Sequence, residues 1–237
     1  MNLTGKRALI TGGTAGIGLA CARLFARAGA TVTVCGRDAE RGRQAAHGIA
    51  TFIQADLADV WSVHTLIEQA GDIDILVNNA ALFPGAMTID QDVDVLRRTL
   101  EVNIIGTYVL TQGLVAGMLA RGHGSIVNVT SLVASKGVPG ASVYSASKAA
   151  VEALTRSWAT EFAPHGIRVN SVAPGPTATE GVTAVWGDTN DELGRGLPMA
   201  RTGMPEEIAE AVLYLASPHS SFITGALLPV DGGGAAA

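Results

Sequence analysis

The sequence predicts an α/β fold with a doubly wound, seven-stranded parallel sheet and helices on both faces. Three observations predict it: short apolar runs alternate with helical patterns, a glycine loop follows the first run, and polar motifs follow later runs. Strands that read as unbroken apolar runs are buried on both faces, which is typical of parallel sheets. We expect a single domain over residues 1–237, because no linker and no internal repeat is visible.

The first half of the chain supplies four expected strands. They are 7–11 (RALIT), 31–35 (TVTVC), 51–55 (TFIQA) and 73–78 (IDILVN). Between them, residues 17–29 have helical apolar spacing that stops at Gly29, and a short helical piece follows Asp38. Asp59 is placed to cap a helix over 60–70.

The second half supplies three more strands and longer helices. The expected strands are 125–130 (SIVNVT), 168–173 (RVNSVA) and 226–230 (ALLPV), and the expected helices are 90–120, 143–162 and 205–217. One connection, about 176–202, has weak periodicity, and loops of that length are usually functional or disordered. Ligands in such sheets bind at the carboxyl ends of the strands.

Charge and hydropathy narrow the function classes. The formal net charge is −5, whereas a nucleic-acid-binding protein would show a basic patch. No run of about 18 apolar residues is present, so we expect no membrane-spanning helix, and the N-terminus has no signal-peptide pattern. Cys21 and Cys35 suggest neither a metal site nor a disulfide, so we expect a cytoplasmic protein without a metal.

A glycine-rich loop, TGGTAGIG at 11–18, joins the first strand to the first helix. Gly12 would permit a sharp turn, Gly16 a close approach to a phosphate, and Gly18 tight packing of helix on strand. The free N–H groups of the helix N-terminus would bind a pyrophosphate. A glycine pattern alone also fits an ordinary turn, but its place between a strand and a helix favours dinucleotide binding.

Polar residues near later strand ends form a candidate catalytic group. Tyr144 and Lys148 share a helix face, where an ammonium would favour the phenolate, although such pairs also occur on solvated helices. Ser131 follows the strand over 125–130 and could equally be a strand terminus or a helix cap. Asn103 lies in an apolar helix, where a packing role satisfied by the backbone is the alternative.

Together these motifs resemble a known family. TGGTAGIG (11–18), NNAA (78–81), Asn103, Ser131, YSASK (144–148) and APGPTAT (173–179) have the order and spacing of classical short-chain dehydrogenases/reductases. The resemblance covers essentially the whole chain. It implies a Rossmann-type fold, an NAD(P)(H)-dependent oxidoreductase acting on CH–OH groups, and a substrate lid at about 176–202.

The resemblance implies a Ser-Tyr-Lys-Asn tetrad. Tyr144 would exchange a proton with the substrate oxygen, and Ser131 would hydrogen-bond that oxygen. Lys148 would bind the nicotinamide ribose and lower the pKa of Tyr144, and Asn103 would anchor a water in a proton relay.

The resemblance also implies a set of cofactor-binding residues, which includes Tyr144 and Lys148 themselves. The glycine loop would line the pyrophosphate with Thr11, Gly12, Thr14, Gly16, Ile17 and Gly18. Asp56 and Leu57 would meet the adenine, Asn79 and Ala80 the adenosine ribose and pyrophosphate region, and Pro174, Gly175, Thr177 and Thr179 the carboxamide. Ala81 stands where the family usually has glycine, and we expect the extra methyl to be tolerated.

The end of the second strand indicates the cofactor. Gly36 stands where an NAD-preferring relative would carry an aspartate that binds the ribose hydroxyls and repels a 2′-phosphate. Arg37 follows with a planar cation suited to phosphate, so NADP(H) is favoured and NAD(H) stays open. Two features limit this preference: Ala15 stands where many NADP-dependent relatives have a second cation, and Asp38 could partly neutralise Arg37.

The substrate pocket is expected to be apolar. Trp186, in the expected lid, fits two readings equally: an aromatic over the substrate, or a residue that packs the lid onto the body. The resemblance further implies dimerisation through the helices around 90–120 and 143–162 and tetramer formation through the last strand, hence a homotetramer or homodimer.

Three functions are consistent with these residues. The favoured one is NADP(H)-dependent reduction of a carbonyl, either a ketone or a 3-oxoacyl type, to a secondary alcohol. The second is an NAD(P)-dependent alcohol dehydrogenase working oxidatively. The third is a non-catalytic nucleotide sensor, which would not need both Tyr144 and Lys148.

Overall fold

The computed structural model describes residues 1–237 and contains one parallel sheet in the order β3-β2-β1-β4-β5-β6-β7. The strands are β1 (Arg7–Thr11), β2 (Thr31–Gly36), β3 (Thr51–Gln54), β4 (Ile75–Asn78), β5 (Gly124–Val129), β6 (Ile167–Pro174) and β7 (Leu227–Val230). All seven predicted strands are confirmed. The strand order reverses between β1 and β4, and open α/β sheets bind ligands at such a reversal.

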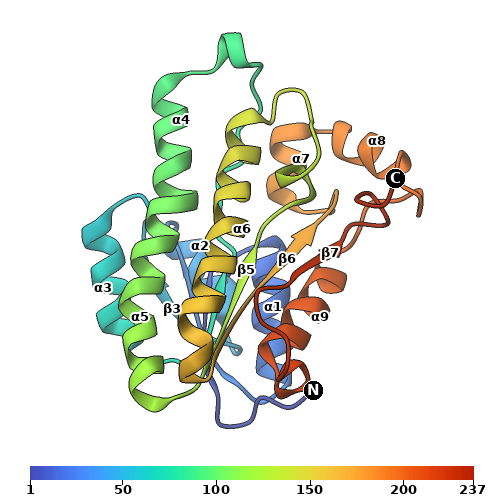
Figure 1. The fold of residues 1–237 in the computed structure, drawn as a ribbon. Helices are drawn as coiled ribbons and strands as arrows, with labels where there is room; N and C mark the ends of the chain where they lie inside the picture. The colour runs from blue at the N-terminus through green and yellow to red at the C-terminus, as the bar shows by residue number, and fades with distance from the viewer.

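Helices cover both faces of this sheet (Figure 1). They are α1 (Gly16–Arg27), α2 (Ala39–Ala46), α3 (Val60–Ala70), α4 (Val93–Leu100), α5 (Thr107–Arg121), α6 (Ser142–Phe162), α7 (Glu180–Trp186), α8 (Thr189–Arg195) and α9 (Pro205–Ala216). Helices α1 and α9 contribute to one core cluster, and α3, α5 and α6 contribute to the other.

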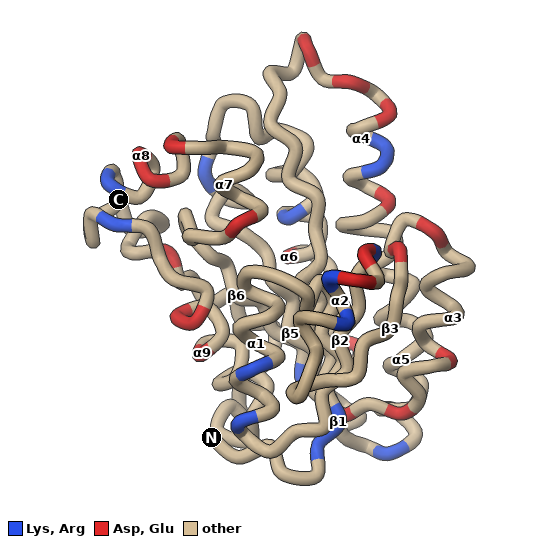
Figure 2. Tube along the Cα trace, turned by 180° about the vertical axis from the view of Figure 1, so that it is seen from behind, with Lys and Arg blue, Asp and Glu red and all other residues tan.

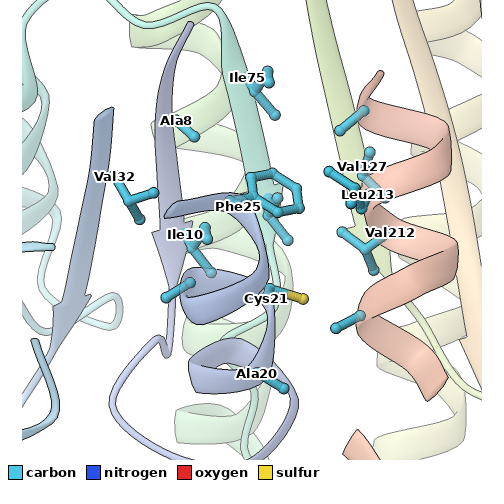
Figure 3. Packing of buried hydrophobic residues seen from close by; sticks show 14 of the residues in the cluster. Ala8, Ile10, Ala20, Cys21, Phe25, Val32, Ile75, Val127, Val212 and Leu213 are labelled. Atoms are coloured by element: carbon cyan, nitrogen blue, oxygen red, sulfur yellow. The ribbon is translucent and has the colours of Figure 1, made fainter. Parts of the chain in front are cut away.

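The two clusters explain why the strands read as continuous apolar runs. In β1, Ala8 and Ile10 belong to the α1 side and Leu9 to the α3 side, because successive side chains of a strand point to opposite faces. Figure 3 shows the α1 side, where Phe25 of α1 and Val212 of α9 pack over the sheet. Because both faces of these strands are buried, their sequences read as continuous apolar runs and lack the alternation of polar and apolar residues seen in a half-exposed strand.

Two predicted helix starts are confirmed by their capping bonds. The Asp38 carboxylate accepts hydrogen bonds from the backbone N–H groups of Glu40 and Arg41, both at 3.0 Å, and α2 begins after it. The Asp59 carboxylate accepts one from Trp61 at 3.0 Å at the start of α3. Such caps satisfy N–H groups that have no partner inside the helix.

The region predicted as one helix over 90–120 is divided in the structure. A π-helical segment, Glu101–Gly106, lies between α4 and α5 and contains Asn103. Gly106 lies against the backbone of Leu57, where an added Cβ would come within 2.1 Å of the Leu57 carbonyl oxygen. Single π-helical turns inside α-helices are rare and frequent at functional sites.

The same helical region, Val93–Arg121, bears on the expectation that no helix spans a membrane. Its length and composition, with a mean hydropathy of 1.4, would suffice for a span. Half of the apolar window is buried inside the fold, however, and core helices pass the same composition test. Packing inside the fold thus accounts for half of this apolar window.

The long connection over 176–202 contains the short helices α7 and α8, which the weak periodicity did not predict. The Thr179 hydroxyl accepts a hydrogen bond from Val182 N at 3.2 Å and caps α7, and Gly187 ends that helix. Helices of seven residues present too few turns for a clear apolar period, and their stability must come from packing.

Candidate functional site

A cavity of about 610 Å³ lies at the carboxyl ends of the strands and extends below α7. Most residues expected to bind cofactor or substrate line it: Gly12, Thr14, Gly16, Ile17, Arg37, Asp56, Leu57, Asn79, Ala80, Ser131, Tyr144, Lys148, Pro174, Gly175, Thr177 and Thr179. Thr11, Gly18 and Asn103 do not line it and instead support residues that do.

The glycine loop has the geometry of a phosphate cradle. Gly12 has a φ of +63°, which side-chain-bearing residues rarely adopt. Gly18 brings α1 against the loop, because an added Cβ would lie 2.2 Å from the Gly12 carbonyl oxygen. No side chain caps the N-terminus of α1, so its backbone N–H groups stay available to an anion.

Thr11 and Asn79 fasten this loop to the end of β4. The Thr11 hydroxyl oxygen accepts hydrogen bonds from the N–H groups of Asn79 and Ala80, both at 3.0 Å. The Asn79 side-chain amide donates to the Thr11 carbonyl at 2.9 Å and to the Gly12 carbonyl at 3.3 Å. Thr11 therefore holds two strand ends together and does not line the cavity.

The structure brings Ser131, Tyr144 and Lys148 together at the other end of the cavity. Ser131 follows β5, and its hydroxyl acts on Tyr144 in the direction that favours the phenolate and lowers its pKa. The Lys148 ammonium lies 5.7 Å from the centre of the Tyr144 ring and donates a hydrogen bond to the Val129 carbonyl at 2.7 Å. The group therefore has a candidate proton donor, a hydroxyl beside it and a buried cation one turn along α6.

The expected lowering of the Tyr144 pKa does not occur in this structure. Burial raises the pKa of Tyr144 to about 12, and the nearby Ser131 hydroxyl acts in the opposite direction without offsetting it. Burial also lowers the pKa of Lys148 to about 8. Desolvation is the main cause of both shifts, because both groups lie inside the protein and burial disfavours the charged form of each. Tyr144 is thus a neutral phenol at pH 7.

Asn103 contacts both the loop after β4 and helix α6. Its side chain accepts a hydrogen bond from Leu82 N at 2.8 Å and donates one to Leu82 O at 2.8 Å. It also donates to the Ser147 hydroxyl at 2.9 Å, and Ser147 donates to the Tyr144 carbonyl at 2.7 Å. Asn103 is 2 % exposed, so these bonds satisfy an otherwise costly buried amide.

The opposite end of the cavity carries two cations. Arg37 and Arg41 both line it, and neither has a carboxylate within 4 Å (Figure 2 colours the basic residues beside α2 blue). The Asp38 carboxylate is bonded to the start of α2, so it does not pair with Arg37. Sequence reasoning missed Arg41. The sequence could have indicated Arg41 by its place about one turn into α2, the helix that Asp38 caps.

Gly36 leaves the end of β2 without a carboxylate. A Cβ at Gly36 would lie 2.9 Å from Thr14 Cγ2, so an aspartate there would require Thr14 to move. The local packing is therefore matched to glycine at this position.

Asp56 is engaged by a residue that the sequence did not indicate. Its carboxylate forms an ion pair with Arg98 of α4 and accepts a hydrogen bond from Ala58 N at 3.0 Å. Burial disfavours its charge, but these bonds and the nearby Arg37 outweigh that effect and lower its pKa. Asp56 is ionised and anchors α4 to the end of β3.

Comparisons with known proteins agree with the geometry. The family model described as Enoyl-(Acyl carrier protein) reductase matches residues 12–234. The chain belongs to the classical short-chain dehydrogenase/reductase family. It is accordingly an NAD(P)-dependent oxidoreductase with a Rossmann-type fold.

Two curated members of this family are similar over nearly their full lengths. The cis-4-hydroxycyclohexanecarboxylate dehydrogenase of Sinomonas cyclohexanicum is 40% identical over 237 residues, which cover 95% of each chain. The 3-oxoacyl-(acyl-carrier-protein) reductase FabG of Thermotoga maritima is 36% identical over 243 residues, 98% of this chain and 99% of that protein.

Two solved structures share the fold. A short-chain dehydrogenase/reductase family protein is 57% identical with a TM-score of 0.95, and the alignment covers all of both chains. A structure assigned as an NAD(P)-dependent gluconate 5-dehydrogenase from Beutenbergia cavernae, with NADP bound at low occupancy, is 35% identical with a TM-score of 0.92. That alignment covers 100% of this chain and 99% of the other.

Proposed function

We propose that the chain is an NADP(H)-dependent reductase that converts an uncharged ketone or a 3-oxoacyl-type carbonyl to a secondary alcohol. The observation that carries this proposal is one cavity with a neutral Tyr144 beside Ser131 and Lys148 at one end and Arg37 at the other. NADPH bound there would supply the hydride. The cavity, the glycine cradle and the two arginines fit such a dinucleotide.

The chain's own residues would place the carbonyl and supply the proton. Ser131 would hydrogen-bond the carbonyl oxygen, and Tyr144 would donate its phenolic proton to that oxygen as negative charge develops. A pKa of about 12 keeps the phenol protonated at neutral pH, and proton donation of this kind contributes about 10²–10⁴ in rate. The Lys148 ammonium would stabilise the phenolate left behind and would hold the nicotinamide ribose.

The charges in the cavity support an uncharged substrate. Arg37, Arg41 and Asp56 lie at the β2–β3 side, and Lys148 and Glu180 are the charged residues nearer the lid. Lys148 is the one cation that lines the cavity on the lid side; it donates to the Val129 carbonyl and would hold the nicotinamide ribose, so no further cation is left there to pair with a substrate carboxylate.

A second candidate is oxidation of a secondary alcohol with NADP or NAD. The similarity to the cis-4-hydroxycyclohexanecarboxylate dehydrogenase supports this direction. The same residues would serve, with Tyr144 accepting the proton.

A panel of ketones and alcohols with NADPH, NADH, NADP and NAD tests both candidates. It should include cyclohexanone, its charged analogue 4-oxocyclohexanecarboxylate, and an acetoacetyl thioester. We expect highest kcat/KM with NADPH and an uncharged ketone. Tight NADPH binding without turnover of any compound would contradict the proposal and favour a nucleotide sensor.

We further propose a cytoplasmic homodimer or homotetramer. Ile105 and Tyr108, at the start of α5, are 48% and 45% exposed, and Phe222, before β7, is fully exposed. These apolar side chains support burial against other copies of the chain. Light scattering at micromolar concentration should give a dimer or tetramer mass, and a stable monomer would contradict this expectation.

A further inference from the structure

Helix α7 lies on the loop that follows β4 through two reciprocal contacts. A Cβ at Gly181 of α7 would lie 3.3 Å from Cζ of Phe83 in that loop. A Cβ at Gly85 of the loop would lie 3.3, 3.4 and 3.6 Å from the Cζ2, Cη2 and Cε2 atoms of Trp186 of α7. Each partner therefore supplies one aromatic ring and one glycine that makes room for a ring.

The spacing of the two contacts matches along both segments. Five residues of α-helix, from 181 to 186, advance about 7.5 Å. Two residues of chain, from 83 to 85, span up to about 7 Å. Both contacts can consequently form at once. A shift of α7 by one residue would break both contacts. The Gly181–Phe83 and Gly85–Trp186 contacts, which we call the lid seat, therefore define a single position for α7.

Phe83 also contacts Tyr144, the proposed proton donor. Its ring meets the Tyr144 ring edge-on, with centroids 6.2 Å apart and an interplanar angle of 71°. Phe83, Tyr144 and Trp186 all line the cavity, as do Val182 and Leu193 of the lid. Phe83 and α7 therefore lie where a substituent of a carbonyl held at Tyr144 can pack.

We propose that Phe83 and Trp186 are specificity-determining residues: the Gly181–Phe83 and Gly85–Trp186 contacts hold α7 in its seat, and the Phe83 ring limits the size of the apolar group beside the reacting carbonyl. This rests on the proposed carbonyl reduction at Tyr144. The substrate class is an uncharged ketone whose substituent packs under α7.

The lid seat is tested with Gly85→Val, which would push Trp186 out, and with Gly137→Val as the matched control. Gly137 has no atom within 4 Å of an added Cβ, so the same side chain fits there. We expect Gly85→Val to raise KM for cyclohexanone at least tenfold and to leave the Kd for NADPH within twofold. Gly137→Val should leave both constants near wild type.

The KM of the double variant shows whether Gly85→Val acts through Trp186 or through a general disturbance of the fold. If Gly85→Val acts by displacing Trp186, adding it to Trp186→Leu should cost less than twofold in KM. Equal effects of Gly85→Val and Gly137→Val, or multiplicative effects of Gly85→Val and Trp186→Leu, would overturn the seat.

The size limit is tested with cyclohexanone and 4-tert-butylcyclohexanone. Phe83→Ala should raise the ratio of kcat/KM for the bulky over the small ketone at least fivefold relative to wild type. An unchanged ratio would overturn the specificity role of Phe83.

Quenching of tryptophan fluorescence tests the lid seat independently of enzyme activity. Trp61 is 82% exposed and Trp158 is buried, so in a Trp61→Phe background Trp186 dominates quenching by acrylamide. Gly85→Val should increase this quenching at least twofold, and Gly137→Val should not. If wild type reduces no ketone, the proposed function fails, while unchanged quenching in Gly85→Val refutes the seat itself.

Discussion

The side-chain amide of Asn103 binds Leu82 at both of its backbone polar groups, with each bond 2.8 Å long. The two residues are 21 positions apart, and Leu82 belongs to the loop that lines the cavity beside Tyr144. Through Ser147 the same amide also reaches the Tyr144 carbonyl. Asn103 thus fixes the loop and helix α6 relative to each other, separately from the proton-relay role that the family resemblance implies.

Asn103→Ala should destabilise the fold and impair catalysis together. The change leaves the Leu82 N–H and carbonyl groups without their partner, which costs at least about 2 kcal/mol of unfolding free energy. Asn103→Asp keeps the bond from Leu82 N but sets a buried carboxylate oxygen against the Leu82 carbonyl, so its loss should be at least as large as that of Asn103→Ala. Urea unfolding and kcat/KM measure the two effects. Normal stability with lost activity would show that Asn103 acts chemically and not by position.

Arg37→Gln should weaken NADPH binding about tenfold while changing NADH binding little, because a charge-assisted bond to the 2′-phosphate is lost. Asp38→Asn is the matched control, since asparagine caps helices as well as aspartate. Its cofactor preference should stay near wild type, because the Asp38 carboxylate is bonded to α2. Fluorescence titration gives both constants, and an equal loss for NADPH and NADH in Arg37→Gln would refute the NADP assignment.

A direct cofactor switch at Gly36 requires attention to Thr14. Because an added Cβ would lie 2.9 Å from Thr14 Cγ2, Gly36→Asp alone combines a change of charge with a steric shift. Pairing Gly36→Asp with Thr14→Ser removes the contacting methyl and isolates the carboxylate.

The buried Lys148 should make stability rise with pH. Its pKa is about 8 in the folded protein and 10.5 when unperturbed, so between these values the unfolded chain binds the additional proton. Unfolding free energy of wild type relative to Lys148→Met should therefore increase by about 1 kcal/mol from pH 8 to 9. Contributions of other groups cancel in this difference. A flat or falling difference would contradict burial of the ammonium.

Both cysteines should be unreactive in the folded protein. Burial raises the pKa values of Cys21 and Cys35 to about 12, and the thiolate is the reactive form. Dithionitrobenzoate at pH 8 should label neither thiol in native protein and both after denaturation. Rapid labelling of the native protein would show that the core around α1 and β2 opens readily.

The sequence predicted the fold closely because its signals are local. Apolar runs define the strands, and Asp38 and Asp59 mark helix starts through bonds to residues two or three positions away. Grouping of Ser131, Tyr144 and Lys148 at one cavity followed from the rule that parallel strand ends meet at one edge.

What the sequence did not predict depends on distant contacts. The π-helical segment around Asn103, the Asp56–Arg98 ion pair and the seat of α7 each join residues far apart in the chain. The raised pKa of Tyr144 was also missed, because residue spacing shows the cation near the phenol but not how strongly both groups are desolvated.

The most direct test of the account is Tyr144→Phe, assayed for NADPH-dependent ketone reduction and for NADPH binding. The substitution keeps the ring that meets Phe83 and removes only the phenolic proton donor. We predict a fall in kcat of at least about 10²-fold, with the Kd for NADPH within twofold of wild type. Turnover within a fewfold of wild type would contradict proton donation by Tyr144, the central claim.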